Sequence, residues 1–349
     1  MTTISLRTAR LRLDVRPDIG GGCAGLWVNA GAVNAGDAGA DWRRAWVSMA
    51  GAREPGWFND LGCYLLAPWS NRVAGAAFPF EGRDVTLRAD WPDGTAIHGV
   101  VKDRAWRVLD RSPFSARLLF ESDEYAGLNW RWRFRAVARY EVADEDVPAP
   151  GGATAAQHWR AALACDLEIT NTDDRPMPAG GGWHPFFART LWPGSADVRV
   201  RIPGARRYPC TNMLPTGPAA RDEVSALLDA GGSLGTTFLD DVFVCDASRP
   251  MVLEWAGPPG ASGGVGGDGG VRCEIERSPE CGHAVVYAPV EQEAGGPARL
   301  GALVCVEPVS MVNDGFRLHA RGEPGTGVVV LRPGETLALR AVFRFSGEG

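Results

Sequence analysis

Apolar residues alternate with polar residues along much of this chain, and this period of two is the feature that most constrains its fold. In the stretches 11–15, 130–135 and 198–202, every second residue is apolar and charged residues, mostly arginines, stand between. Such alternation is typical of β-strands with one buried face. Similar short apolar runs occur at 116–121, 163–170, 251–255, 283–288, 302–306, 328–331 and 337–345. The sequence therefore predicts a long series of strands.

Turn-forming residues separate these runs. The chain contains 45 glycines and 25 prolines, and both favour turns because glycine adopts positive φ and proline fixes φ. Helical periodicity is weak, and 222–230 is the best short candidate for a helix. Many strands, frequent turns and little helix indicate an antiparallel sandwich or barrel, so we expect an all-β fold.

Two stretches have the composition of loops. The stretch 143–156 is acidic and then rich in proline, glycine and alanine, and 256–270 consists largely of glycine and proline. We expect both to be mobile surface loops between strands. The length of 349 residues leaves one or two domains open. Because the same strand patterning continues on both sides of each loop, we expect a single β-domain over residues 1–349.

The charge balance argues against several classes of partner. Lysine and arginine number 36 against 42 aspartates and glutamates, a net charge of −6, which leaves no basic surplus for nucleic acid or an anionic membrane surface. The eight cysteines are scattered without a Cys-x-x-Cys pair, which indicates reduced, mostly buried thiols. The first residues lack the apolar core of a signal peptide, and no apolar run approaches about 20 residues. We expect a cytoplasmic protein.

The five histidines include two candidates for chemistry. His98 precedes a glycine, which would let a ligand or another backbone approach closely. His184 lies in 180–187, where three glycines, flanking aromatic residues and a proline favour a shaped apolar rim. A lone histidine is ordinarily a hydrogen-bonded structural residue, and this setting favours a functional role for His184. We interpret His158 and His319 as structural.

Several other polar residues stand in notable contexts. Glu307 follows an apolar strand pattern, and a buried carboxylate is costly unless it is paired or used. Alternation does not decide which face of the strand Glu307 occupies. The pair Asp240 and Asp241 raises the same question, and there a turn between strands is the favoured interpretation. Asn71 and Arg72 together offer a fork of donors beside an amide, which suits vicinal hydroxyl groups.

Other chemistries find less support. His98, His184 and Glu307 could be imagined as metal ligands, but they lack the short spacing of readable metal sites. The sequence Cys281-Gly282-His283 invites a thiol nucleophile, yet neighbours in sequence are not catalytic neighbours. A phosphate-binding Gly-x-x-x-x-Gly-Lys loop and a Gly-x-Ser-x-Gly elbow are both missing, and the glycine runs do not lead from a strand into a helix.

A set of short motifs, taken together, resembles a known family. The motifs are 68–73 (Pro-Trp-Ser-Asn-Arg-Val), 97–99 (Ile-His-Gly), 182–187 (Gly-Trp-His-Pro-Phe-Phe), 239–240 (Leu-Asp), 306–308 (Val-Glu-Pro) and 331–335 (Leu-Arg-Pro-Gly-Glu). In order and spacing they resemble the aldose 1-epimerase (galactose mutarotase) family from about residue 10 to 346. The resemblance implies a large antiparallel β-supersandwich and a small-molecule sugar, an aldohexose, as ligand.

The resemblance also implies roles for six residues. His184 matches the family's general acid and Glu307 its general base, and the hydroxyl-binding positions match Asn71, Arg72, His98 and Asp240. Two features depart from the family pattern. The stretch 285–288 lacks the polar residue that several members place near the sugar, and Asp241 stands where histidine or asparagine is more usual. These departures leave the identity of the aldose open.

The residue types fit the chemistry of anomer exchange. A base must take the proton of the C1 hydroxyl and an acid must protonate the ring oxygen, and a carboxylate with an imidazolium provides both without a metal or an organic cofactor. We therefore predict an aldose 1-epimerase. Two alternatives remain: a non-catalytic sugar-binding or regulatory protein on the same fold, and a hexose-6-phosphate 1-epimerase, which would need several cationic groups converging on the phosphate. The sequence leaves the oligomeric state open.

Overall fold

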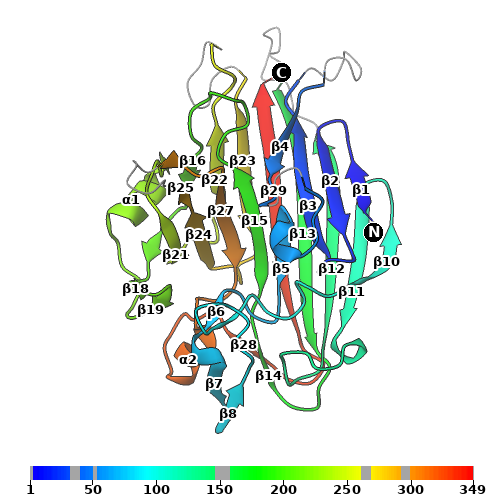
Figure 1. Cartoon of the computed structure of the whole chain (residues 1–349), viewed down its shortest axis with the longest axis vertical. Coiled ribbons are helices and arrows are strands. Elements are labelled where there is room, and N and C mark those ends of the chain that lie inside the picture. The colour runs from blue at the N-terminus through cyan, green and yellow to red at the C-terminus, as the bar shows by residue number, and fades with distance from the viewer. Residues whose placement is uncertain are drawn as a thin grey trace.

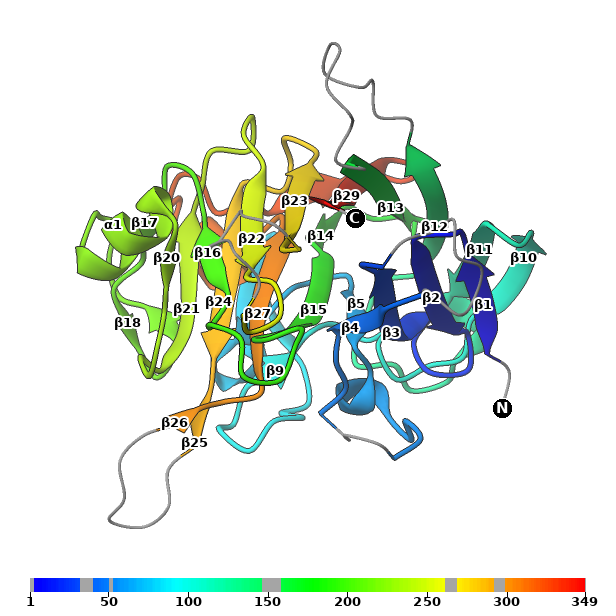
Figure 2. The same cartoon turned by 90° about the horizontal axis from the view of Figure 1, so that it is seen from above.

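The computed structural model describes residues 3–31, 40–49, 53–145, 158–260, 269–291 and 299–348. In these residues antiparallel strands form two large sheets that lie face to face (Figure 1; Figure 2). Only two short α-helices accompany them, α1 (Glu223–Ala230) and α2 (Gly315–Ala320). The expected fold class is confirmed: the protein is an all-β antiparallel supersandwich.

The first large sheet carries both proposed catalytic residues. Its strands, in spatial order, are β1 (Ile4–Arg7), β2 (Leu11–Arg16), β3 (Gly22–Asn29), β4 (Trp42–Trp46), β15 (Gly182–Ala188), β27 (Leu303–Val309), β24 (His283–Ala288), β21 (Leu239–Val244) and β17 (Arg206–Arg207). The tenth strand, β5 (Cys63–Leu66), pairs with β15 and β3. Segments far apart in the sequence thus become neighbours in the middle of this sheet.

The second large sheet backs the first. Its strands are β10 (Arg107–Arg111), β11 (Ser115–Glu121), β12 (Phe134–Glu145), β13 (His158–Asn171), β29 (Thr336–Glu348), β23 (Val271–Arg277), β22 (Met251–Trp255), β16 (Arg199–Arg201) and β20 (Gly232–Ser233). The long C-terminal strand β29 pairs with both β13 and β23 and so joins the two halves of this sheet.

Short two-stranded sheets decorate the sandwich. They are β6 (Arg72–Val73) with β9 (Ala96–Ile97), β7 (Ala77–Phe80) with β8 (Arg83–Thr86), β14 (Met177–Ala179) with β28 (Val329–Leu331), β18 (Cys210–Thr211) with β19 (Leu214–Pro215), and β25 (Val290–Glu291) with β26 (Arg299–Leu300). The single-turn 3₁₀ helices are η2 (Phe58–Asp60), η3 (Ala74–Ala76) and η4 (Ser122–Glu124). The pair β6 and β9 holds one wall of the candidate site described below.

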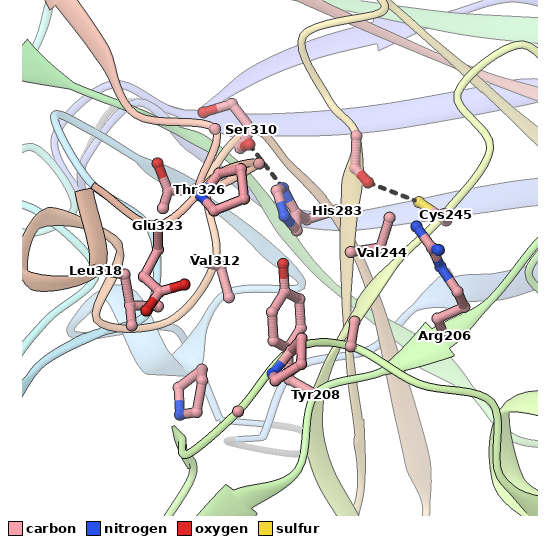
Figure 3. A pocket seen from close by; sticks show the side chains of 18 of the residues that line it. Arg206, Tyr208, Val244, Cys245, His283, Ser310, Val312, Leu318, Glu323 and Thr326 are labelled. Atoms are coloured by element: carbon pink, nitrogen blue, oxygen red, sulfur yellow. Dashed lines mark hydrogen bonds between the residues drawn. The ribbon is translucent and has the colours of Figure 1, made fainter. Parts of the chain in front are cut away.

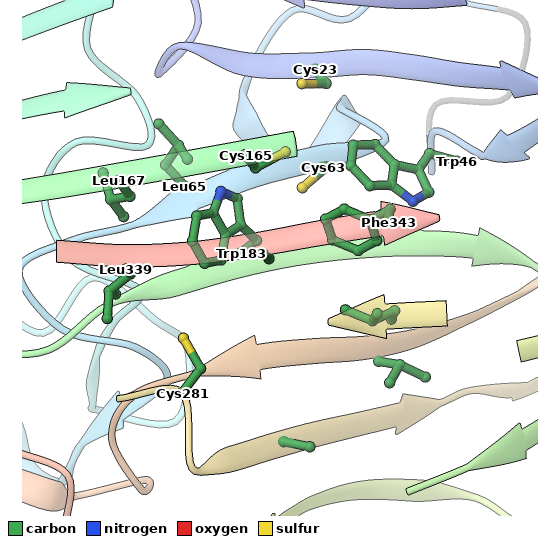
Figure 4. Packing of buried hydrophobic residues seen from close by; sticks show 14 of the residues in the cluster. Cys23, Trp46, Cys63, Leu65, Cys165, Leu167, Trp183, Cys281, Leu339 and Phe343 are labelled. Atoms are coloured by element: carbon green, nitrogen blue, oxygen red, sulfur yellow. The ribbon is translucent and has the colours of Figure 1, made fainter. Parts of the chain in front are cut away.

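The main core fills the space between the two large sheets. Figure 4 shows Trp46 and Trp183, which project from the first sheet, beside Leu339 and Phe343 of β29 in the second. All four side chains are buried. The rings of Trp46 and Phe343 meet edge to face with centroids 4.9 Å apart, an arrangement that aromatic pairs prefer.

Strand β15 buries both of its faces. Trp183 and Phe187 point into the core between the sheets, whereas Phe186 belongs to a second apolar cluster on the opposite face of the first sheet. His184 shares that opposite face because alternate residues of a strand point the same way. The chain therefore uses one face of β15 for the core and the other for the candidate site.

Two expectations about local structure are wrong. Residues 130–133 alternate like a strand, but β12 begins only at Phe134. Trp130 and Trp132 are both buried, and their tilted rings lie with centroids 4.8 Å apart, so the alternation in 130–133 reflects the burial of these rings and not strand pairing. In addition, Asp240 and Asp241 do not form a turn: both lie within β21 and pair with β24.

The two expected loops and the expected helix have different outcomes. Residues 143–145 belong to β12, where they pair with β13, so the loop begins later than expected and the rest of 143–156 lies outside the described residues. In 256–270, the described ends contain no strand, and 261–268 lie outside the described residues. The expected helix is present as α1, whose first turn is closed by a capping box between Asp222 and Ser225.

No helix in the described part of the chain is long and apolar enough to cross a membrane.

Candidate active site

His184 and Glu307 lie on adjacent strands of the first sheet. The register pairs Phe186 of β15 with Cys305 of β27 and Gly182 with Val309, which sets His184 opposite Glu307. Nε2 of His184 lies 3.2 Å from Oε1 of Glu307, and both side chains are buried. Glu307 thus occupies the face of β27 that points away from the main core.

A loop beside β5 brings His98 and Asn71 to the same place. The backbone amide of His98 donates to the carbonyl oxygen of Asn71 at 2.9 Å, and both residues have positive φ, 60° and 54°. The chain's single lysine, Lys102, is buried under this loop, where Nζ donates to the carbonyl oxygens of Ile97 at 2.9 Å and Gly99 at 2.8 Å. Lys102 therefore fastens the loop that presents His98.

All six residues named from the sequence line one pocket. The pocket has a volume of 220 Å³ and lies over β15, β27 and β21. Its polar lining consists of Asn59, Asn71, Arg72, His98, His184, Asp240 and Glu307. The arrangement is suited to a small polar molecule whose functional groups face several directions at once.

Arg72 is held in place by three side chains. Its Nε donates to Oδ2 of Asp93 at 2.9 Å, one terminal nitrogen donates to Oδ1 of Asn71 at 3.2 Å, and the other donates to Oδ2 of Asp240 at 3.4 Å. Hydrogen bonds from Thr95 and Arg72 lower the pKa of Asp93, although partial burial opposes them. Burial raises the pKa of Asp240, with Arg72 opposing the shift. The guanidinium is thus fixed before any ligand arrives.

The central pair is buried in a way that disfavours charge on either member. Burial, with a smaller contribution from Arg72, lowers the pKa of His184 to about 3. Burial and the neighbouring Asp240 raise the pKa of Glu307 well above its ordinary value, although Arg72 opposes this shift. Burial therefore favours the neutral imidazole and the protonated carboxyl group, an arrangement in which the pair holds one proton on Glu307.

Several polar atoms in the pocket lack hydrogen-bond partners in the described part of the chain. Both carboxyl oxygens of Glu307, Nδ1 of His184 and Nδ1 of His98 are buried and make no hydrogen bond with the described residues. Unpaired buried polar groups are costly, and most proteins avoid them. Their concentration around one pocket indicates that a ligand with hydroxyl groups completes them.

Aromatic rings form the apolar walls. The ring of Tyr64 stacks on His184 with centroids 4.5 Å apart, and that of Phe186 does so at 4.6 Å. Trp91 and Tyr287 add two more aromatic side chains to the lining. These rings shield the acid–base pair from water and restrict the orientation of the His184 imidazole.

The sequence does not single out several residues of the site, among them Tyr64, Trp91, Asp93 and Tyr287. These four come from three separate segments, and none stands in an unusual sequence context. Asp93 follows a proline and precedes a glycine, which reads as an ordinary turn. Only the position of Arg72 in space reveals that Asp93 is its partner.

One group of side chains in the described residues has the makings of a metal site. Donor atoms of His184, Cys305 and Glu307 all lie within 4.8 Å of one another. Burial, with Glu307 adding to it, raises the pKa of the Cys305 thiol well above its usual range. A thiol must lose its proton to bind a metal, so these surroundings disfavour Cys305 as a metal ligand.

Comparison with known proteins bears on the resemblance seen in the sequence. Residues 39–149 match the sequence model of the family described as Aldose 1-epimerase. The resemblance to the aldose 1-epimerase family is confirmed. The chain is also 24% identical over 349 residues to the uncharacterized protein YphB of Escherichia coli K12, covering 96% of each chain.

Solved structures of this type share the fold. A galactose mutarotase-like protein from Clostridium acetobutylicum superposes with a TM-score of 0.68 at 16% identity, covering 98% of this chain and 94% of the other. The GalM/aldose epimerase homologue from C. elegans superposes with a TM-score of 0.69 at 14% identity, covering 100% and 99%. The aldose 1-epimerase resemblance thus extends over the full length at the level of the fold.

Proposed function

We propose that this protein is an aldose 1-epimerase that interconverts the α and β anomers of a free aldose. The observation that carries the proposal is the buried contact of 3.2 Å between Nε2 of His184 and Oε1 of Glu307 at the base of a pocket of 220 Å³. A proton donor and a proton acceptor side by side are what ring opening needs.

The proposed reaction moves two protons and no other group. Glu307 takes the proton of the C1 hydroxyl, the electron pair left on that oxygen forms the carbonyl, and the bond from C1 to the ring oxygen breaks. His184 delivers its proton to the ring oxygen. The open aldehyde rotates about the C1–C2 bond, and the reverse transfers close the ring on the other face. Each proton transfer contributes typically about 10²- to 10⁴-fold to the rate.

The single proton of the pair fits this sequence of events. For ring opening, Glu307 must be a carboxylate and His184 an imidazolium, whereas after ring opening Glu307 is protonated and His184 is neutral. Burial favours the second arrangement, as the opposite pKa shifts of the two groups indicate. Hydroxyl groups of a bound sugar and the cation of Arg72 would stabilise the carboxylate and make the first arrangement accessible.

The remaining polar residues are proposed to hold the sugar. Asn71, His98 and Asp240 face the pocket together with Arg72, and amide, imidazole, carboxylate and guanidinium groups between them supply donors and acceptors for vicinal hydroxyls. Asp93 is proposed as a positioning residue because it bonds Nε of Arg72 and does not line the pocket. The aromatic walls accommodate the C–H faces of the sugar ring.

The two alternatives receive less support. A pure binding protein has no need of a buried carboxyl group whose oxygens both lack hydrogen-bond partners among the described residues, a feature that destabilises the fold. A sugar phosphate requires converging cations, and Arg72 is the only lysine or arginine among the described lining residues. Its guanidinium is already engaged by three side chains.

Polarimetry tests the proposal directly. Freshly dissolved α-D-glucose or α-D-galactose should reach anomeric equilibrium faster with the protein than in buffer alone. Glu307→Gln and His184→Asn should each lower kcat by about 10²-fold or more while sugar affinity changes within a few fold. Arg72→Ala and Asp240→Asn should act largely on KM, because they serve ground state and transition state alike.

A matched control separates chemistry from folding. Glu141→Gln changes a partly exposed carboxylate on β12 of the second sheet and should leave kcat unchanged. Saturable sugar binding without any acceleration for several common aldoses would assign the protein to the binding class instead.

A further inference from the structure

A second cavity lies on the same face of the first sheet, beyond the candidate active site. It has a volume of 780 Å³ and is bounded by the ends of β21 and β24, by the segment 215–219 and by the segment 321–327 (Figure 3). It shares no lining residue with the first pocket. Nothing in the proposed anomer exchange uses it.

His283 forms part of its floor. The side chain is only 5% exposed, and Nδ1 lies 2.9 Å from the carbonyl oxygen of Ser310, so that Nδ1 carries a hydrogen and donates it. The other nitrogen, Nε2, is buried and has no hydrogen-bond partner among the described residues. Burial lowers the pKa of His283, although the carbonyl groups of Ser310 and Gly325 oppose the shift. In the neutral ring, Nε2 is an acceptor that awaits a donor.

Tyr208 stands across a short gap from this acceptor. Figure 3 shows its phenol oxygen pointing toward the His283 ring, and the two ring centroids are 6.2 Å apart. The hydroxyl of Tyr208 makes no hydrogen bond with the described residues. A ligand hydroxyl placed between them could donate to Nε2 of His283 and accept from the phenol of Tyr208. An ammonium group cannot accept, and a carboxylate cannot donate, so a hydroxyl is the group that fits both.

The charges at the rim balance. Arg206 and Arg321 line the cavity together with Glu280 and Glu323, all four are exposed, and none of them forms an ion pair with another described residue. Two positive and two negative groups give no net attraction for an anion or a cation. The walls also include the apolar side chains of Val244, Val312 and Leu318, which suit the C–H surface of a neutral molecule.

The second cavity is separate from the first pocket. Val285 pairs with Glu307, and His283 pairs with Val309, so that Glu307 and His283 are diagonal neighbours about 7–8 Å apart. The two valines that complete this square are 1% and 0% exposed. Buried apolar side chains therefore stand between the two floors, and one ring cannot occupy both.

We propose that this cavity is a second binding site, for a neutral polyhydroxylated ligand such as a sugar or a polyol, with one ligand hydroxyl bridging Nε2 of His283 and the phenol oxygen of Tyr208. The proposal does not depend on the proposed epimerase activity. It predicts two classes of site on one chain.

Equilibrium dialysis with radiolabelled D-glucose tests it. The wild-type protein should bind two molecules per chain. Tyr208→Phe, which removes only a hydroxyl, and His283→Leu should each weaken one class at least tenfold and leave the other unchanged, whereas Arg72→Ala should weaken only the first class. D-glucitol should compete for the second class, and inorganic phosphate should not.

The outcomes distinguish the two proposals. Three results would overturn the second site. They are a second class of glucose site that Tyr208→Phe and His283→Leu leave intact, a single class of site that is lost only in Arg72→Ala, and displacement of glucose from the second class by phosphate. A single class lost in Tyr208→Phe and kept in Arg72→Ala would support the second site and count against the epimerase. Thermal unfolding of each variant checks that the loss is not one of folding.

Discussion

Glu307 presents a conflict between its proposed role and its surroundings. A general base must be ionised, yet burial and Asp240 favour the protonated carboxyl group. The conflict is resolved if His184 and Glu307, which lie 3.2 Å apart, act as one unit that holds a single proton and changes its position through the oxygens of the bound sugar. The motifs in the sequence were enough to identify the two residues. Their shared proton could not be predicted, because it depends on burial and on contact between two strands that are far apart in the sequence.

The pH dependence of catalysis should belong to the pair. Below pH about 3, the pKa of His184, the pair takes a second proton and the carboxylate is lost. Above the raised pKa of Glu307 the pair loses its only proton and the acid is lost. We expect kcat/KM from polarimetry to stay level across pH 6.5, the ordinary pKa of histidine. A drop to half its value near pH 6.5 would show an imidazole that titrates freely.

The same burial predicts that Glu307→Gln stabilises the fold. The pKa of Glu307 is higher in the folded state than in the unfolded state, so its contribution to stability is present below the unfolded pKa of about 4.3 and is lost as pH rises through the folded value. The loss amounts to about 1.4 kcal/mol per pH unit between the two pKa values. Urea unfolding should find the variant more stable than wild type at pH 8 and equal to it at pH 4. A variant less stable at pH 8 would contradict the assignment.

At the scale of the element, the sequence does not show which way the side chains of a strand point when both faces of that strand are buried. Strands β15 and β27 are buried at every position, so hydrophobic alternation cannot tell their two faces apart. The structure does: Trp183 faces the core, and His184 faces the pocket. The isolated helix α1 could be predicted because its capping residues are local, whereas Trp130 and Trp132 misled because their partners lie elsewhere in the chain.

The loop that carries His98 depends on Gly99. A Cβ at Gly99 would lie 1.9 Å from the carbonyl oxygen of Ala67, and its φ is +72°. Gly82 has nearly the same φ, +71°, with no atom within 4 Å of its Cβ position. Gly82→Ala should therefore cost only about 1–2 kcal/mol for the left-handed backbone. Gly99→Ala should cost clearly more and should also lower mutarotation, as denaturant unfolding and polarimetry would show; equal costs would mean that the loop can move away.

At the scale of the whole molecule, the fold class follows from period-two patterning, but the strand order does not. The first sheet places β15 beside β4 and β27, which come from opposite ends of the chain. Such pairings depend on which edges meet during folding, and alternation within one strand carries no information about its neighbour. The position of the site residues therefore also depends on the strand order, because the site is assembled from β5, β15, β21 and β27.

The main core predicts that the chain unfolds as one domain over residues 1–349. Phe343 is fully buried on β29, which pairs with both β13 and β23, and its ring contacts Trp46 of the opposite sheet. Phe343→Ala should therefore cost about 3–5 kcal/mol and shift far-ultraviolet circular dichroism and tryptophan fluorescence transitions together. Phe114→Ala, at a side chain 53% exposed, should change stability by about 0.5 kcal/mol or less. A core shared by both sheets should make their strands unfold in the same transition. If unfolding instead showed two separate transitions and Phe343→Ala moved only one of them, the chain would consist of two domains.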